Sequence, residues 1–264
     1  MYVTRTDDQW ALLEQADPTV PIVMLNLIRF RQRALDGCGC DGMTGEEAYA
    51  EYGRRLRALA AEFPGTAFWV GEAKNTFIGP DDERWDLVLL VGYDSVSTFR
   101  NMLATDAYQA AAIARTAAVL DSRLVLATED IHIGDAMKLW ARGGDDDEGP
   151  IVMLNLIQYR DTVLEGHTCD GMTGEDAYDE YLSRLEGMND HDFPGTVIWN
   201  GDARATIIGP VEERWDRLLL IGYPSLDEFR RMAGSKAYQT AAPARTAAVG
   251  DSRLILMHQR FPRP

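Results

Sequence analysis

Two asparagines interrupt apolar segments of the sequence that are almost identical to each other. The segments begin at Pro21 and Pro150, and Asn26 and Asn155 occupy the same place in each. An apolar run of this length, bounded by proline and then by charge, predicts a buried strand. A buried amide without a hydrogen-bond partner costs about 1–3 kcal/mol. Each asparagine therefore either orients a substrate carbonyl or bonds to a neighbouring loop, and both interpretations stay open.

Three pairs of arginines also recur in the two copies. The pairs are Arg31 with Arg160, Arg115 with Arg245, and Arg123 with Arg253. A guanidinium at the mouth of a cavity can hold a carboxylate through two parallel hydrogen bonds. The alternative is an ion pair within the protein, which we expect for Arg123 because Asp121 lies on the same side of its strand. For Arg31 and Arg160 we predict a substrate-binding role and for Arg115 and Arg245 a catalytic one, and a structural role stays open for both pairs.

Paired aromatic and acidic side chains complete the symmetric candidates. The aromatic candidates for substrate binding are Tyr52, Tyr181, Trp69 and Trp199. Aromatic side chains on helix faces and strands usually pack in a core. Trp69 could instead wall a flat pocket beside Gly71, as Trp199 could beside Gly201. Asp86 and Asp216 each begin an apolar strand, where a partly buried carboxylate could act as a general base or accept a hydrogen bond from a loop.

The three cysteines form an asymmetric candidate. Cys38 and Cys40 lie in a glycine-rich loop of the first copy, and His167 and Cys169 lie in the aligned loop of the second copy. Together they make a Cys3His set, which can bind zinc tetrahedrally. The site requires the two loops to meet. Unpaired thiols in separate surface loops are the alternative.

Composition excludes several classes of function. The chain has 264 residues, of which 46% are hydrophobic, and a formal net charge of −16. Such an acidic chain repels phosphate backbones and anionic lipids, so we expect neither nucleic acid nor membranes as partners. No glycine-rich phosphate-binding motif follows a strand, so we expect no nucleotide or flavin cofactor. No histidine recurs in both copies, which excludes a Ser-His-Asp arrangement in each unit. Three cysteines and the absence of a signal-like N-terminus favour a reducing cytoplasm.

The elements that position these residues belong to a unit that is duplicated within the sequence. Ile22 corresponds to Ile151 and Trp69 to Trp199, with one residue inserted between these two pairs. Each unit reads strand–helix–strand–strand–helix–strand, which is the split ferredoxin-like pattern. We predict units at residues 1–130 and 131–264, with an acidic, glycine-rich linker at 143–149. We also predict a short helix before each first strand, at 6–16 and at 135–141.

Nearly continuous apolar strands indicate a sheet that is buried on both faces. In each unit helices cover one face, so the second face must be covered by the other unit. We therefore predict an α+β fold in which tandem ferredoxin-like units form a pseudo-dimeric barrel. Alternation places Asn26 on the strand face of Met24 and Ile28, and we expect that face to line the barrel lumen.

Several motifs resemble those of an uncharacterised bacterial family of dimeric α+β barrel proteins. They are Met-Leu-Asn-Leu followed by arginine, Glu213-Arg-Trp-Asp216, Tyr223-Pro-Ser225 before Phe229, and Ala237-Tyr-Gln239 before Arg245. The resemblance covers both units and implies the fold. It implies no activity, because the family has none that is settled.

Three functions remain open from the sequence. The first is a small-molecule enzyme of the oxygenase, isomerase or cyclase type, which uses the lumen to act on an aromatic or carboxylate-bearing substrate. The second is a non-catalytic binding protein for a small metabolite, and the third is a metal-binding protein that uses the cysteine loops. The sequence favours the enzyme. Whether the fused chains associate further stays open.

Overall fold

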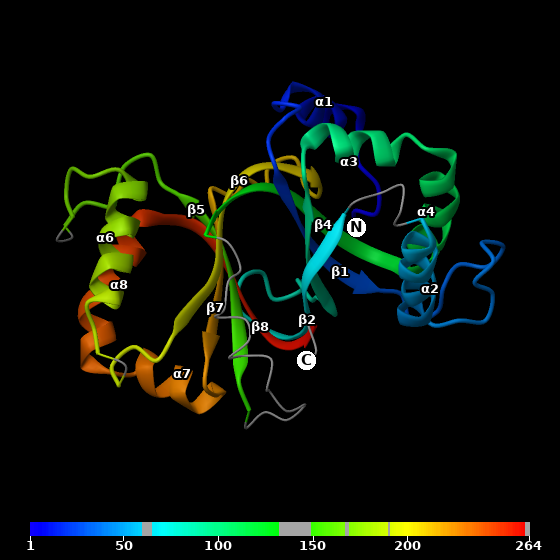
Figure 1. Ribbon diagram of the computed structural model, residues 1–264. Helices are drawn as coiled ribbons and strands as arrows, with labels where there is room; N and C mark the ends of the chain where they lie inside the picture. The colour runs from blue at the N-terminus through cyan, green and yellow to red at the C-terminus, as the bar shows by residue number, and fades with distance from the viewer. Residues whose placement is uncertain (60–64, 132–148, 167–168, 190, 262–264) are drawn as a thin grey trace.

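The computed structural model describes residues 1–59, 65–131, 149–166, 169–189 and 191–261 (Figure 1). The predicted helix at 135–141 lies outside these residues, as does most of the predicted linker at 143–149. Among the described helices, none has the length and apolarity needed to cross a membrane.

The first unit contains a short leading helix and then the predicted order of strands and helices. Its elements are α1 (Asp7–Gln15), β1 (Ile22–Phe30), α2 (Gly45–Ala58), β2 (Thr66–Ile78), β3 (Leu87–Tyr93), α3 (Val96–Leu103), α4 (Asp106–Ala118) and β4 (Val119–Ile131). The second unit repeats the order with β5 (Ile151–Tyr159), α6 (Gly174–Glu186), β6 (Thr196–Ile208), β7 (Arg217–Tyr223), α7 (Leu226–Ala233), α8 (Lys236–Ala248) and β8 (Val249–Phe261).

Local sequence explains where the longer helices begin. At α2, the Thr44 hydroxyl accepts from the backbone N–H of Glu47 at 3.2 Å, while the Glu47 carboxylate accepts from the Thr44 backbone N–H at 2.8 Å. This reciprocal pair is the predicted capping box. At α6, the shorter Asp176 bonds the Thr173 hydroxyl at 2.7 Å, and Thr173 caps the Asp176 N–H at 3.1 Å.

The eight strands close one antiparallel barrel, in the order β1-β3-β2-β8-β5-β7-β6-β4. The two sheets join edge to edge, where β2 pairs with β8 and β4 pairs with β6. Figure 1 shows α2 and α4 packed outside one half of the barrel and α6 and α8 outside the other. The fold is therefore the predicted pseudo-dimeric α+β barrel.

The lumen of the barrel is packed with side chains from both units. On β1 the inward face is that of Val23, Leu25 and Leu27, which join a cluster that also contains their second-unit counterparts. Trp69 and Trp199 belong to the same cluster and are fully buried. The Trp69 ring lies over Gly71, where a Cβ atom would come within 2.1 Å of the ring. This overturns the hypothesis of a pocket beside Trp69, because the ring itself occupies the space that the glycine leaves.

A duplicated clamp joins the units at the barrel rim. Arg123 Nε donates to the carboxylate of Glu213 at 2.7 Å, and Arg253 Nε donates to that of Glu83 at 2.9 Å. Each glutamate also accepts from a tryptophan of its own unit, Trp215 or Trp85. The predicted pairing of Arg123 with Asp121 is present at 3.5 Å. The shorter bond runs to the other unit.

Candidate functional site

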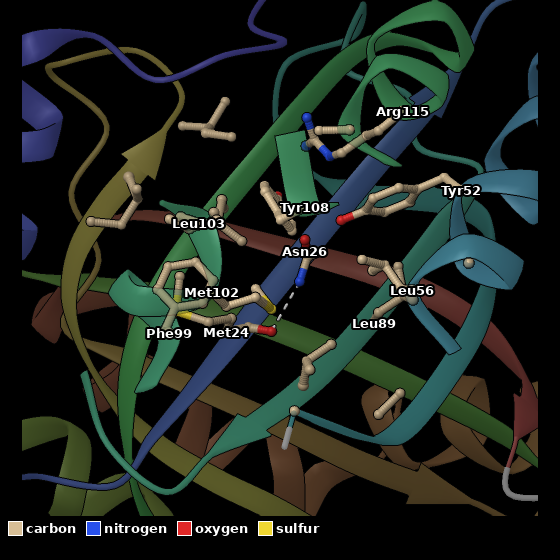
Figure 2. A pocket seen from close by; sticks show the side chains of 18 of the residues that line it. Met24, Asn26, Tyr52, Leu56, Leu89, Phe99, Met102, Leu103, Tyr108 and Arg115 are labelled. Carbon is tan, nitrogen blue, oxygen red and sulfur yellow. Dashed lines mark hydrogen bonds between the residues drawn. The ribbon is translucent and has the colours of Figure 1, made fainter. Parts of the chain in front are cut away.

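A cavity of about 620 Å³ lies in the first unit between the outer face of the sheet and helices α2, α3 and α4. Its walls are mainly apolar, with Met24 and Leu89 on the strands and Leu56, Phe99 and Met102 on the helices (Figure 2). The N-terminal segment contributes residues 3–5. Apolar walls with a few polar groups are typical of small-molecule sites.

Asn26 is the polar group on the sheet side of this cavity. Its Nδ2 donates to the Met24 backbone carbonyl at 3.1 Å, which leaves the amide oxygen directed into the cavity (Figure 2). The expectation that Asn26 lines the barrel lumen is wrong, because the opposite face of β1 points inward. Both faces of the strand are apolar, so alternation alone does not tell which face is inside. The partner that Asn26 requires is a backbone carbonyl of its own strand.

Three tyrosines and one arginine surround the upper part of the cavity. Figure 2 shows the Tyr52 hydroxyl directed toward Asn26, with Tyr108 and Arg115 beside it. Burial raises the pKa of Tyr52 well above its usual value. It also raises the pKa of Tyr49 to about 12, although the neighbouring Arg115 opposes that shift. Both phenols are therefore neutral hydrogen-bond donors at physiological pH.

Arg115 connects the cavity to the N-terminal segment. It is 9% exposed, donates through Nη1 to the Val3 carbonyl at 2.7 Å and through Nη2 to the Ser122 hydroxyl at 3.2 Å. The other charged lining residues are Arg5 and Arg57. Among the described residues that line the cavity, none is histidine, cysteine, aspartate or glutamate. The arrangement can therefore stabilise an anion but supplies no conventional general base.

The second unit fills the equivalent space with larger side chains. Leu182, Val197 and Ile221 stand where the first unit has Gly53, Ala67 and Val91. Ile221 belongs to the core of the second unit, and the partly buried Leu182 and Val197 pack against that core. Asn155 is only 8% exposed. The Tyr181 and Tyr238 hydroxyls lie 3.4 Å apart there. The duplicated asparagine and tyrosine thus face an open cavity in one unit and a packed core in the other.

Asp86 and Asp216 are exposed side chains away from the cavity. They accept from the backbone N–H groups of Phe30 and Tyr159, each at 2.6 Å. The hypothesis of a partly buried general base is therefore wrong. The alternative interpretation, an aspartate that accepts from a backbone donor, is correct.

Most of the remaining arginine candidates lie outside the cavity that contains Asn26. Arg31 and Arg160 do not line the cavity, and Arg160 instead borders a groove at the start of β8. Arg245 borders the same groove, whereas its counterpart Arg115 reaches both the cavity and the N-terminal segment.

The cysteine loops lie at opposite ends of the molecule. Cys38 and Cys40 pack against the core of the first unit, and Cys169 packs in that of the second. The two loops lead into α2 and α6, which Figure 1 shows on opposite sides of the barrel. His167 lies outside the described residues. Within those residues, no cluster of three metal-ligating side chains forms, so the shared zinc site is not supported.

Two lining residues on α2, Gly53 and Arg57, were not predicted from the sequence. A usable signal was present in the duplication, because Gly53 aligns with Leu182 on a helix face that is otherwise equivalent. Where one unit has a small residue and the other has a large residue at the aligned position, the unit with the small residue has room for a cavity.

Comparisons with known proteins support the family resemblance. A family model described as a domain of unknown function (DUF1330) matches residues 42–128. A solved protein of unknown function from Rhodopseudomonas palustris is 39% identical over 47% of this chain and 94% of its own, with a TM-score of 0.44. The chain belongs to the DUF1330 family. A comparison with curated proteins found no match.

Two other solved structures are similar over both units of this DUF1330 chain. An anthrone oxidase-like protein is 10% identical, with 93% of each chain covered and a TM-score of 0.45. A chlorite dismutase from Candidatus Nitrospira defluvii is 12% identical, with 96% of this chain and 95% of that chain covered and a TM-score of 0.44.

Proposed function

We propose that the cavity of the first unit is the active site of a small-molecule enzyme. The observation that carries the proposal is the Asn26 amide, which lies with the neutral Tyr52 phenol in a cavity whose walls are mainly apolar. The substrate class is an aromatic or carboxylate-bearing molecule. The reaction is of the isomerase, cyclase or oxygenase type and uses no nucleotide or flavin.

The chemistry common to these reactions is formation of an anion on the substrate. When an acidic C–H or O–H group loses its proton to water, the negative charge that remains on a carbonyl or phenolic oxygen needs hydrogen-bond donors. Tyr52 can donate to that oxygen, and the positive charge of Arg115 lies nearby. In a cavity with apolar walls, such fixed donors stabilise charge more strongly than water-exposed groups do.

The second unit provides a matched control for this proposal. A panel of aromatic ketones, phenols and aromatic acids is screened by thermal shift, and each compound that binds is analysed for product by mass spectrometry. We expect Asn26→Ala to weaken binding or turnover at least tenfold, and Asn155→Ala to leave both unchanged. If the two variants changed binding and turnover equally, the cavity of the first unit would not be the active site.

A binding protein is the second candidate, and one observation favours it. The described lining of the cavity contains no carboxylate or imidazole that could accept a proton. If compounds bind in an Asn26-dependent manner and are recovered unchanged after long incubation in air, the binding function is correct and the enzymatic one is not.

A further inference from the structure

A second recess lies on the opposite unit, at the start of β8. This β8 groove, of about 540 Å³, is bordered by residues 78–80, Arg160, Leu164, Arg245, Thr246 and residues 249–253. It lies outside the proposed active site. Its counterpart in the first unit, at the start of β4, has the same residue type at every one of these positions except that Leu120 replaces Gly250.

The counterpart groove at β4 holds a peptide, which is the N-terminal segment of this chain. The Tyr2 carbonyl accepts from the Ser122 backbone N–H at 2.7 Å and from the Ser122 hydroxyl at 2.8 Å. The Val3 carbonyl accepts from Arg115 at 2.7 Å, and the Tyr2 N–H donates to Asp121. All of these hydrogen bonds involve backbone groups of the extended N-terminal segment.

The same groove also recognises one side chain. The Arg123 guanidinium lies 5.2 Å from the centre of the Tyr2 ring, a distance at which a cation is attracted to an aromatic face. The groove at β4 therefore contacts an aromatic ring at the first position of this extended segment and donates hydrogen bonds to the carbonyls of that residue and the next.

The β8 groove presents the same donors without a backbone acceptor from the described residues. Ser252 Oγ is bonded by Arg245 at 3.3 Å, and Asp251 accepts from Arg253 at 2.7 Å. Among the described contacts of Arg245, there is no carbonyl equivalent to that of Val3. Arg245 is only partly buried, whereas Arg115 is 9% exposed beneath its segment.

Apolar surface is also left uncovered at the β8 groove. Ile78 is 38% exposed, whereas its counterpart Ile208 is 7% exposed. Leu164 on the same recess is 41% exposed and its counterpart Leu35 is 43% exposed, so the two grooves differ at Ile78 and not at this leucine. A segment that covered Ile78 would gain hydrophobic free energy in addition to its hydrogen bonds.

We propose that the β8 groove is a docking site for an extended peptide segment of a partner protein, in which an aromatic residue is followed by a β-branched one. The intramolecular segment at β4 defines the mode of recognition. Main-chain bonds to Ser252 and Arg245 give affinity, and an aromatic ring beside Arg253 gives selectivity, as in other sites that bind extended strands.

The test uses the full chain and an acetylated, fluorescently labelled peptide with the sequence of residues 1–6. We expect saturable binding of one peptide per chain by fluorescence anisotropy. A peptide with alanine in place of tyrosine should bind at least tenfold more weakly. In the protein, Arg245→Gln should weaken binding at least tenfold, whereas the matched first-unit variant Arg115→Gln should retain the affinity of the β8 site.

Ile78→Ser gives a variant with little risk to folding, because this side chain is partly exposed, and it should weaken binding about threefold or more. Absence of saturable binding would overturn the proposal, and so would binding that neither Arg245→Gln nor Ile78→Ser changes. Sedimentation of the unmodified chain tests whether a second copy of the chain, instead of a partner protein, occupies the groove. Self-association that the peptide reverses and Arg245→Gln abolishes would assign the groove to a second copy instead of a partner protein.

Discussion

The two units share a barrel and a clamp but differ in what lies between sheet and helices. In the first unit this space is a cavity that Asn26 and Tyr52 face. In the second unit larger side chains, Leu182, Val197 and Ile221, pack in or against the core at the equivalent positions. Residues kept in both units, Asn26 and Tyr52 among them, thus face a cavity in only one unit, and the residues that differ decide which unit can bind a molecule. Duplication of a residue is therefore not by itself a sign of function.

Loss of the clamp should have the largest effect on stability and should be the same in both units. Arg123 and Glu213 are less than a tenth exposed, as are Arg253 and Glu83. Removal of either glutamate leaves a buried arginine with only the more exposed Asp121 or Asp251 as its partner, and breaking a buried ion pair costs about 3–5 kcal/mol. We expect Glu83→Ala and Glu213→Ala each to lower the free energy of unfolding by about 3 kcal/mol in urea, while Glu212→Ala at an exposed neighbour has little effect. A loss in only one unit would show that the clamp is not symmetric.

Alkaline pH should affect Tyr49 and its counterpart Tyr178 equally. Burial raises the pKa of Tyr49 and of Tyr178 to about 12, from 10.0. The native state then holds a proton that the unfolded chain releases, so stability is complete below pH 10 and falls as the pH rises toward 12. Each tyrosine should contribute a loss of about 1.4 kcal/mol per pH unit in this window. Urea unfolding between pH 9 and 12 should show a shallower loss for Tyr49→Phe and Tyr178→Phe, and unchanged slopes would contradict the assignment.

Gly53→Leu should convert the first unit toward the second. The new side chain would enter the cavity, so we expect at least a tenfold loss of ligand affinity in the thermal-shift panel. A Cβ atom at Gly53 meets only Arg57, at 3.6 Å, and glycine in a helix costs about 0.8–1.0 kcal/mol relative to alanine. The variant should therefore be about 0.5–1 kcal/mol more stable while it binds less. Gly53→Ala is the matched control, because it gains helix stability and leaves the cavity open.

The helix caps should give the smallest difference. The reciprocal bond at α2 requires the length of Glu47, and Asp176 at α6 is one methylene shorter. We expect Asp176→Glu to stabilise the chain by about 0.5 kcal/mol and Glu47→Asp to destabilise it by a similar amount. Thermal unfolding of the two variants should move in opposite directions, and shifts of the same sign would rule out the explanation.

The fold could be predicted from the sequence because the signals are local and occur twice. The Thr44 capping box and the apolar segments around Asn26 and Asn155 each specify an element without reference to the rest of the chain. The order of these elements then leaves few topologies. Family motifs pointed to the same barrel, and the comparisons confirm the family.

The candidate site was predicted less well, for physical reasons. Alternation shows that Asn26 shares a face with Met24, but not which face is inside when both are apolar. The bulk of Trp69 and Trp199 in the lumen decides this, and bulk is a property of the assembled barrel. The zinc hypothesis depended on whether the loops of Cys40 and Cys169 meet, and the pseudo-twofold arrangement places them far apart. The bond from Arg253 to Glu83 likewise depends on the closed ring.

Closure of the ring within one chain has a consequence for assembly. When two separate chains form such a barrel, strand pairs like β2–β8 and β4–β6 form only on association, and stability depends on protein concentration. Here both pairs form between parts of the same molecule, at a high effective concentration. Dilution should therefore leave the unfolding midpoint unchanged. The first unit, which has the cavity, is also always joined to the packed second unit. The sequence of the first unit can therefore change without loss of its partner.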